Sequence, residues 1–217
     1  MGALPAIRRL HGTVVVVVAG RAVLAPGALG EAFAEDLAFL RYGGARPVVV
    51  HDAGPEQVRR APDEDEGTAL RRVAAGLVQR RLVGLVNAHG PLAVGITGED
   101  GHTLTRSPSG NLVADPGVLL TLLTDGRIPV VAAVAHGPDG VHPAETVTTA
   151  RLLAARLSAR HLLLPAGTVA ETETQSAART ETGAASKEGR PATTGTRPID
   201  TAVPHALLRT LYGLEAT

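Results

Sequence analysis

Short apolar runs alternate along the chain with amphipathic stretches. The five valines at residues 14–18 predict a strand that is buried on both faces, as strands of parallel sheets are. Similar apolar runs predict further strands at residues 47–50, 93–96, 129–135 and 161–164. Between these runs, apolar residues recur at every third or fourth position. The pattern predicts helices over residues 28–41, 68–87, 118–124 and 144–158.

Strands and helices that alternate in this way indicate an α/β fold with a largely parallel sheet. Ligands of such folds bind beyond the carboxyl ends of the strands. Functional residues are therefore expected at three junctions, residues 18–22, 51–55 and 96–101. Residues 111–114 are a candidate hairpin strand, and a last short helix is expected to begin near Pro204.

Residues 170–198 differ from the rest of the chain in composition. They are rich in Thr, Ala, Gly, Ser and Glu and contain no branched aliphatic residue. A segment without apolar side chains to bury cannot form a core, so we expect it to be mobile or disordered. The apolar pattern returns at residue 203.

Charge and composition exclude several classes of protein. The 217 residues include 21 Lys+Arg and 21 Asp+Glu, and this zero net charge argues against a nucleic-acid binder, which needs a basic face. The absence of cysteine excludes disulfides and cysteine-ligated metals, and we expect no metal centre in the protein. The longest apolar run is too short to cross a bilayer, and Arg8, Arg9 and His11 interrupt any signal-peptide core. We expect a cytoplasmic protein without a membrane partner.

Lysine is almost absent from the chain. Lys187 is the only lysine among the 21 basic residues, and the others are arginines. Codon bias in a GC-rich genome explains such a preference. It also means that an enzyme that needs several lysines has only one available.

The segment VNAHGP at residues 86–91, followed by AVGITGED at residues 93–100, resembles bacterial acetylglutamate kinases of the amino-acid-kinase family. Weaker matches are LHG at 10–12, FAEDLAFLR at 33–41, PVVVH at 47–51, GRIPVV at 126–131 and VPHALL at 203–208. The resemblance implies an αβα three-layer sandwich with a mainly parallel sheet. It also implies phosphoryl transfer from ATP, with Mg²⁺, to the side-chain carboxylate of N-acetyl-L-glutamate, a step of arginine biosynthesis.

The resemblance further implies a division into lobes. Residues 1–135 correspond to the amino-acid-binding lobe, and residues 136–169 to the start of the nucleotide lobe. The tract 170–198 lies where the family has a long ATP-binding region, so the C-terminal lobe is shortened and strong ATP binding is not expected. Residues 199–217 return to the fold.

The implied reaction brings a carboxylate against a γ-phosphate, so its site needs cations and glycine loops that let backbone N–H groups approach phosphate. By resemblance, Val18 takes the place of a lysine at the end of the first strand, Gly20 is a retained glycine and Arg21 replaces the next one. After the second strand, the family's histidine and three glycines read HDAG at residues 51–54. The implied substrate-binding residues are Gly20, Arg21, Asp52, Ala53 and Gly54.

The changes in this loop oppose the implied chemistry. Asp52 adds a negative charge, and two like charges about 4 Å apart repel by about 4 kcal/mol at an effective dielectric constant of about 20. Ala53 adds a Cβ where the backbone should approach a ligand. The chain between Gly54 and Thr68 is also too short for the family's arginine that binds the substrate α-carboxylate.

Two catalytic candidates follow from the resemblance. Glu145, within PAET at residues 143–146, replaces an aspartate that organises the family's lysines. Taken without the family, the same residues are typical of a helix start. Lys187, within GAASKE at residues 183–188, is similar to a family lysine that contacts phosphate, although a lysine in such a tract is also typical of solvated surface.

Three functional hypotheses follow. The first is an acetylglutamate kinase homologue with impaired catalysis, whose ligand is N-acetylglutamate or a similar acidic amino acid. The second is a catalytically silent regulatory or assembly partner, which would form homo- or hetero-oligomers with kinase subunits. The third is a small-molecule binding module that keeps an amino-acid pocket without transfer, with Arg21 as its basic residue.

Overall fold

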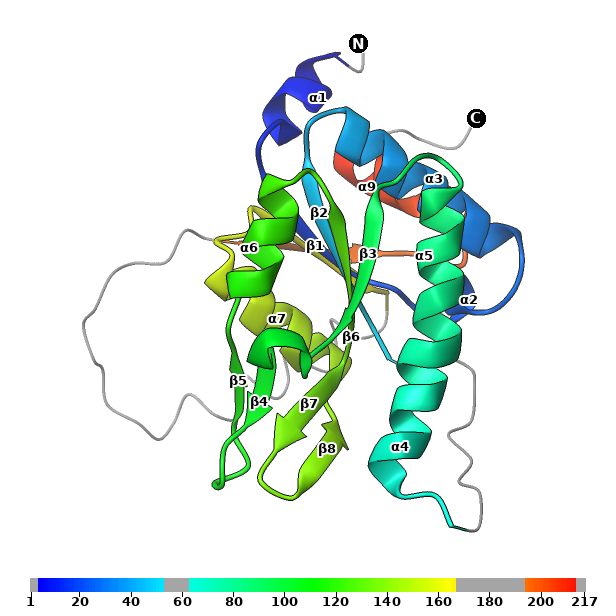
Figure 1. The fold of residues 1–217 in the computed structure, drawn as a ribbon. Coiled ribbons are helices and arrows are strands. Elements are labelled where there is room, and N and C mark those ends of the chain that lie inside the picture. The colour runs from blue at the N-terminus through cyan, green and yellow to red at the C-terminus, as the bar shows by residue number, and fades with distance from the viewer. Residues whose placement is uncertain (1–3, 53–62, 167–193, 214–217) are drawn as a thin grey trace, which may run out of the picture.

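The computed structural model describes residues 4–52, 63–166 and 194–213 of the chain. Its main sheet has six parallel strands in the order β10-β9-β1-β2-β6-β3 (Figure 1). In that order the strands are Gly195–Ile199, His161–Pro165, Val14–Val18, Arg46–His51, Ile128–Ala132 and Ala93–Thr97. The predicted mainly parallel sheet is confirmed.

A second, smaller sheet continues from the main one. It has the order β5-β4-β7-β8, with bounds Leu112–Ala114, Leu104–Arg106, Val134–Gly137 and Gly140–Pro143. The prediction of one strand over residues 129–135 is therefore wrong, because the chain passes from β6 to β7 at Ala133. The residues on both sides of this break are apolar and buried, so composition alone does not reveal it.

Helices cover both faces of the main sheet and complete three αβα layers (Figure 1). One face packs against α3 (Ala28–Tyr42), α5 (Arg80–Asn87) and α9 (Ala206–Tyr212), and the other against α6 (Gly117–Thr124) and α7 (Thr146–Arg156). The valines of β1 alternate between the two cores, with Val15 and Val17 in the first and Val16 in the second. This alternation explains why β1 has no polar position.

The helix predicted over residues 68–87 is continuous but changes its geometry along its length. It consists of α4 (Glu66–Leu70), the π-helix η1 (Arg71–Gln79) and α5. At the end of η1, the buried Gln79 Nε2 donates to the carbonyls of Ile96 at 2.6 Å and Val130 at 2.9 Å. These bonds hold the helix against β3 and β6. Three short helices were not predicted: α1 (Leu4–Leu10), α2 (Arg21–Leu24) and η2 (Asp100–His102).

The C-terminal part of the chain returns to the fold earlier than the composition indicates. Residues 195–198, at the end of the tract expected to be mobile, belong to β10, which pairs in parallel with β9. Backbone hydrogen bonds define this edge strand, so it needs few apolar side chains. Residues 167–193 lie outside the described part, and the division into lobes stays a prediction. None of the described helices is long and apolar enough to cross a membrane.

Candidate functional site

A cavity of about 420 Å³ lies at the carboxyl ends of β1, β2 and β9. This is the edge of the sheet where parallel α/β folds bind ligands. Four of the sequence-predicted site residues line the cavity together: Gly20, Arg21, Asp52 and Glu145. The other three, Ala53, Gly54 and Lys187, lie outside the described residues.

Gly20 is covered by a residue that the sequence reasoning missed. A Cβ added to Gly20 would lie 2.4 Å from Thr201 Oγ1, so the threonine fills the space beside the glycine. Thr201 also lines the cavity and comes from the segment between β10 and α9. The VPHALL match at residues 203–208 was the available signal that this segment returns to the site.

Arg21 and Asp52 are two of the charged residues that line the cavity. Arg21 is the first residue of α2 and is exposed, and its side chain makes no hydrogen bond or ion pair to another described residue. Asp52 directly follows β2 and is also exposed. Among the described residues that line the cavity, Arg21 is the only cation, and Asp52 and Glu145 are the carboxylates.

His51, the last residue of β2, lies directly beside Asp52 and is fully buried. Its Nδ1 lies 2.7 Å from the backbone oxygen of Asp52, which can only accept, so Nδ1 carries the proton. Burial lowers the pKa of His51, and this effect outweighs the hydrogen bond and charge of Asp52, which raise it. His51 is therefore a neutral residue that fixes the end of β2.

Glu145 caps the N-terminus of α7. Its two carboxylate oxygens accept hydrogen bonds from the backbone N–H groups of Val147, at 2.9 Å, and Thr148. Burial raises the pKa of Glu145, but the bonds from Thr148 and Val147 together with the charge of Arg151 outweigh it, so the pKa lies below its ordinary value. The geometry is that of a helix cap, and Pro143 ends β8 instead of starting the helix.

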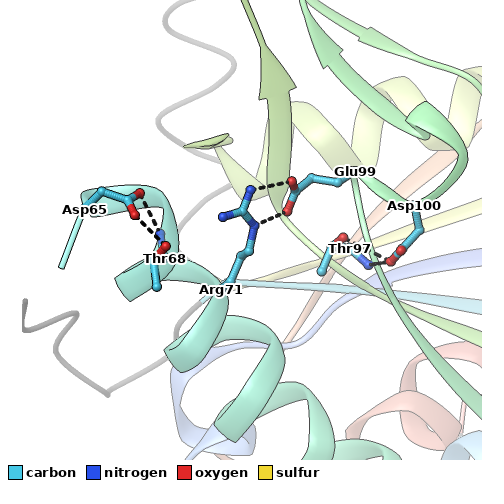
Figure 2. A network of polar contacts seen from close by, with 6 residues as sticks. All are labelled: Asp65, Thr68, Arg71, Thr97, Glu99 and Asp100. Atoms are coloured by element: carbon cyan, nitrogen blue, oxygen red, sulfur yellow. Dashed lines mark hydrogen bonds and ion pairs between the residues drawn. The ribbon is translucent and has the colours of Figure 1, made fainter. Parts of the chain in front are cut away.

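The third predicted junction, after β3, lies outside the cavity and is held by its own polar network, which Figure 2 shows. Arg71, at the start of η1, makes two bonds of 2.8 Å to the carboxylate of Glu99, which also raise the pKa of Arg71. Asp100 Oδ2 accepts from Thr97 N at 2.6 Å and closes the turn. These contacts fix the junction to the long helix and give it a structural role.

Comparison with known proteins identifies the family to which the chain belongs. A model of the amino acid kinase family matches residues 12–165. The chain belongs to this family. It is 42% identical over 195 residues to an acetylglutamate kinase of Streptomyces coelicolor, covering 75% of this chain and 63% of that protein. It is 40% identical over 193 residues to an acetylglutamate kinase of a Mycobacterium species, covering 75% and 67%. The chain thus spans about two thirds of the length of the curated relatives it matches.

Solved structures agree with this family fold. An N-acetylglutamate synthase from Neisseria gonorrhoeae, complexed with coenzyme A and N-acetyl-glutamate, is 25% identical with a TM-score of 0.59, covering 75% of this chain and 43% of that one. An isopentenyl phosphate kinase superposes with a TM-score of 0.62 at 15% identity, covering 93% and 97%. The second likeness shows the fold alone.

The described cavity fits the phosphates and metal ion of a kinase poorly. Thr201 fills the space at Gly20, and the described lining holds two carboxylates and a single arginine. Both oxygens of Glu145 accept hydrogen bonds from the N-terminus of α7, which orients the carboxylate toward the helix. Within residues 4–52, 63–166 and 194–213, no group of three or more His, Asp or Glu side chains could hold a metal ion. We therefore derive no step through Mg²⁺ or ATP.

Proposed function

We propose that this chain is an acetylglutamate kinase homologue that keeps an amino-acid pocket but transfers phosphoryl groups poorly. Its relatives are named acetylglutamate kinases, which supports N-acetyl-L-glutamate or a similar acidic amino acid as the ligand. One observation carries the impairment: the cavity at the strand ends has one arginine and two carboxylates.

Phosphoryl transfer places negative charge on the oxygens of the transferred group. The protein's main contribution to such a reaction is positioning and charge neutralisation, for which cations must face the transferred phosphate. In this cavity Val18 occupies the end of β1, and Arg21 stands three residues further along the chain. Asp52 adds charge of the wrong sign. Exposure of Asp52 to water weakens this repulsion below the value calculated for an effective dielectric constant of about 20.

Binding without transfer is a second candidate function, and one observation favours it. Arg21 is exposed at the cavity and has no partner among the described residues, so its guanidinium is available to a ligand carboxylate. A carboxylate ligand needs one such cation, whereas the γ-phosphate of ATP needs several. The two candidates predict the same binding of N-acetylglutamate and differ only in turnover.

Calorimetry with the full chain tests the proposal, with N-acetylglutamate and Mg-ATP titrated separately. We expect saturable binding of N-acetylglutamate and no saturable heat from Mg-ATP. Tight binding of Mg-ATP would contradict the impairment. The acetylglutamate kinase of Streptomyces coelicolor provides the positive control for both ligands.

Trapping of an acyl phosphate with hydroxylamine measures turnover directly. A slow signal above the blank supports the impaired kinase, and a signal equal to the blank supports the binding module. Turnover at the rate of the Streptomyces relative overturns both. The triple variant Val18→Lys, Asp52→Gly, Ala53→Gly should not restore that rate, because the shortened nucleotide lobe is unchanged.

A further inference from the structure

A second cavity, of about 320 Å³, lies at the opposite edge of the main sheet, where β9 and β10 begin. Three arginines and a histidine line it: Arg9 from α1, Arg160 and His161 at the start of β9, and Arg197 from β10. The last turn of α9 closes one side. None of the described lining residues is acidic.

The guanidinium groups that share this cavity repel one another, although all three arginines are exposed and water screens the repulsion. A counter-charge at the cavity reduces the repulsion further. The backbone carbonyls at the C-terminus of α9 supply part of this counter-charge, since Arg197 Nη1 donates to Thr210 O at 3.2 Å. One carbonyl bond does not neutralise three arginines. It does orient the Arg197 guanidinium, whose other N–H groups remain available to a ligand.

The pKa of His161 responds to the same arginine charges. Burial lowers its pKa first, and the charges of Arg197 and Arg160 lower it further. Its Nδ1 is buried and has no hydrogen-bond partner among the residues that the structure describes. Partial burial next to two arginines therefore favours the neutral imidazole, and a bound anion would oppose this effect.

We propose that this cavity binds a small phosphate-bearing anion, inorganic phosphate or a compact phosphate monoester, through Arg9, Arg160 and Arg197. Arginine suits this ligand because its planar fork of donors matches two phosphate oxygens at once. The bound anion would join α1, the start of the β9–β10 pair and the end of α9, which come from distant parts of the chain. The proposal does not rest on the proposed function, because the two cavities lie at opposite edges of the sheet.

Calorimetry at constant ionic strength tests it, with inorganic phosphate titrated into the full chain and chloride as the balancing salt. We expect saturable binding at one site, weakened at least tenfold by the double variant Arg160→Gln, Arg197→Gln. The matched control is Arg156→Gln, an exposed arginine at the end of α7 outside both cavities, which should bind phosphate as the parent does. Glucose 6-phosphate and acetate are titrated into the full chain in two further experiments. Binding of either phosphate compound supports the proposal, and equal binding of acetate overturns its phosphate class.

NMR titration of His161 gives a readout in the parent chain, independent of whether the arginine variants fold. A bound phosphate dianion should raise the pKa of His161 relative to chloride buffer, with the resonance assigned by its loss in His161→Gln. An unchanged pKa at saturating phosphate, or undiminished binding by a folded double variant, overturns the proposal.

Discussion

The two edges of the main sheet carry opposite charge. At the carboxyl edge, one arginine, Arg21, faces two carboxylates, Asp52 and Glu145. At the amino edge, three arginines surround a cavity with no described carboxylate. The zero net charge of the chain conceals this separation. Among the described residues that line the two cavities, positive charge is thus concentrated at the edge away from the strand ends where α/β proteins bind their ligands.

Helix α9 and the turn before it connect the two edges. Thr201 lines the cavity at the carboxyl edge, and residues Thr210 to Gly213 line the one at the amino edge. Between them, the buried Asp36 of α3 accepts hydrogen bonds from His205 Nδ1 at 2.8 Å, Leu207 N at 3.1 Å and Leu208 N at 3.4 Å. One carboxylate therefore fixes the segment that completes both cavities.

Removing the Asp36 carboxylate should have the largest effect on stability and on both cavities. Asp36→Ala leaves the N-terminal N–H groups of α9 unpaired in a buried place, and we expect a loss of about 3 kcal/mol in the free energy of unfolding. Urea denaturation measures it. The neighbouring Glu35→Ala is the matched control, because Glu35 is exposed and should change stability by less than about 0.5 kcal/mol. Equal effects of the two variants would show that Asp36 does not hold α9.

Arg21 should have the next largest effect, confined to the carboxyl edge. Arg21→Ala removes the only described cation that lines the cavity, and we expect the affinity for N-acetylglutamate to fall about tenfold. Arg46→Ala, an exposed arginine at the amino end of β2, should leave that affinity unchanged. Calorimetry compares the affinities of the two variants for N-acetylglutamate. If Arg46→Ala weakens binding as much as Arg21→Ala, general electrostatic attraction explains the binding and the pocket does not.

Two of the three junctions predicted from the sequence contribute to the cavity at the carboxyl edge, the third lies outside it, and the cavity at the amino edge was not predicted. Strands that are apolar throughout and end in glycine or polar residues locate the carboxyl edge by a general rule, so Gly20, Arg21 and Asp52 could be expected to meet there. Glu145 followed only from the family resemblance. No comparable rule applies to the amino edge. Arg9, Arg160 and Arg197 are far apart in the chain, and only the parallel pairing of β10 with β9 brings the last two together. Thr201 was missed for the same reason.

Glu145 should affect stability more than chemistry. Glu145→Ala removes the cap of α7, and we expect a loss of about 1 kcal/mol at neutral pH. The folded pKa lies below the ordinary value of 4.5, so the unfolded chain takes up the proton first as the pH falls. The parent therefore loses this stability below about pH 4.5, where it approaches the variant. Glu31→Ala, in the first turn of α3, is the control and should show no such convergence.

The smallest effect should come from Asp52, and it has the opposite sign. Asp52→Asn removes a negative charge from the cavity that Arg21 also lines, so we expect the affinity for N-acetylglutamate to rise about threefold, a small change because the side chain is exposed. Asp139→Asn, at the exposed turn between β7 and β8, changes the net charge equally and should have no effect. A rise in both variants would indicate a response to net charge. A rise in Asp52→Asn alone, reduced by added salt, would show that the charge at this edge opposes its own ligand.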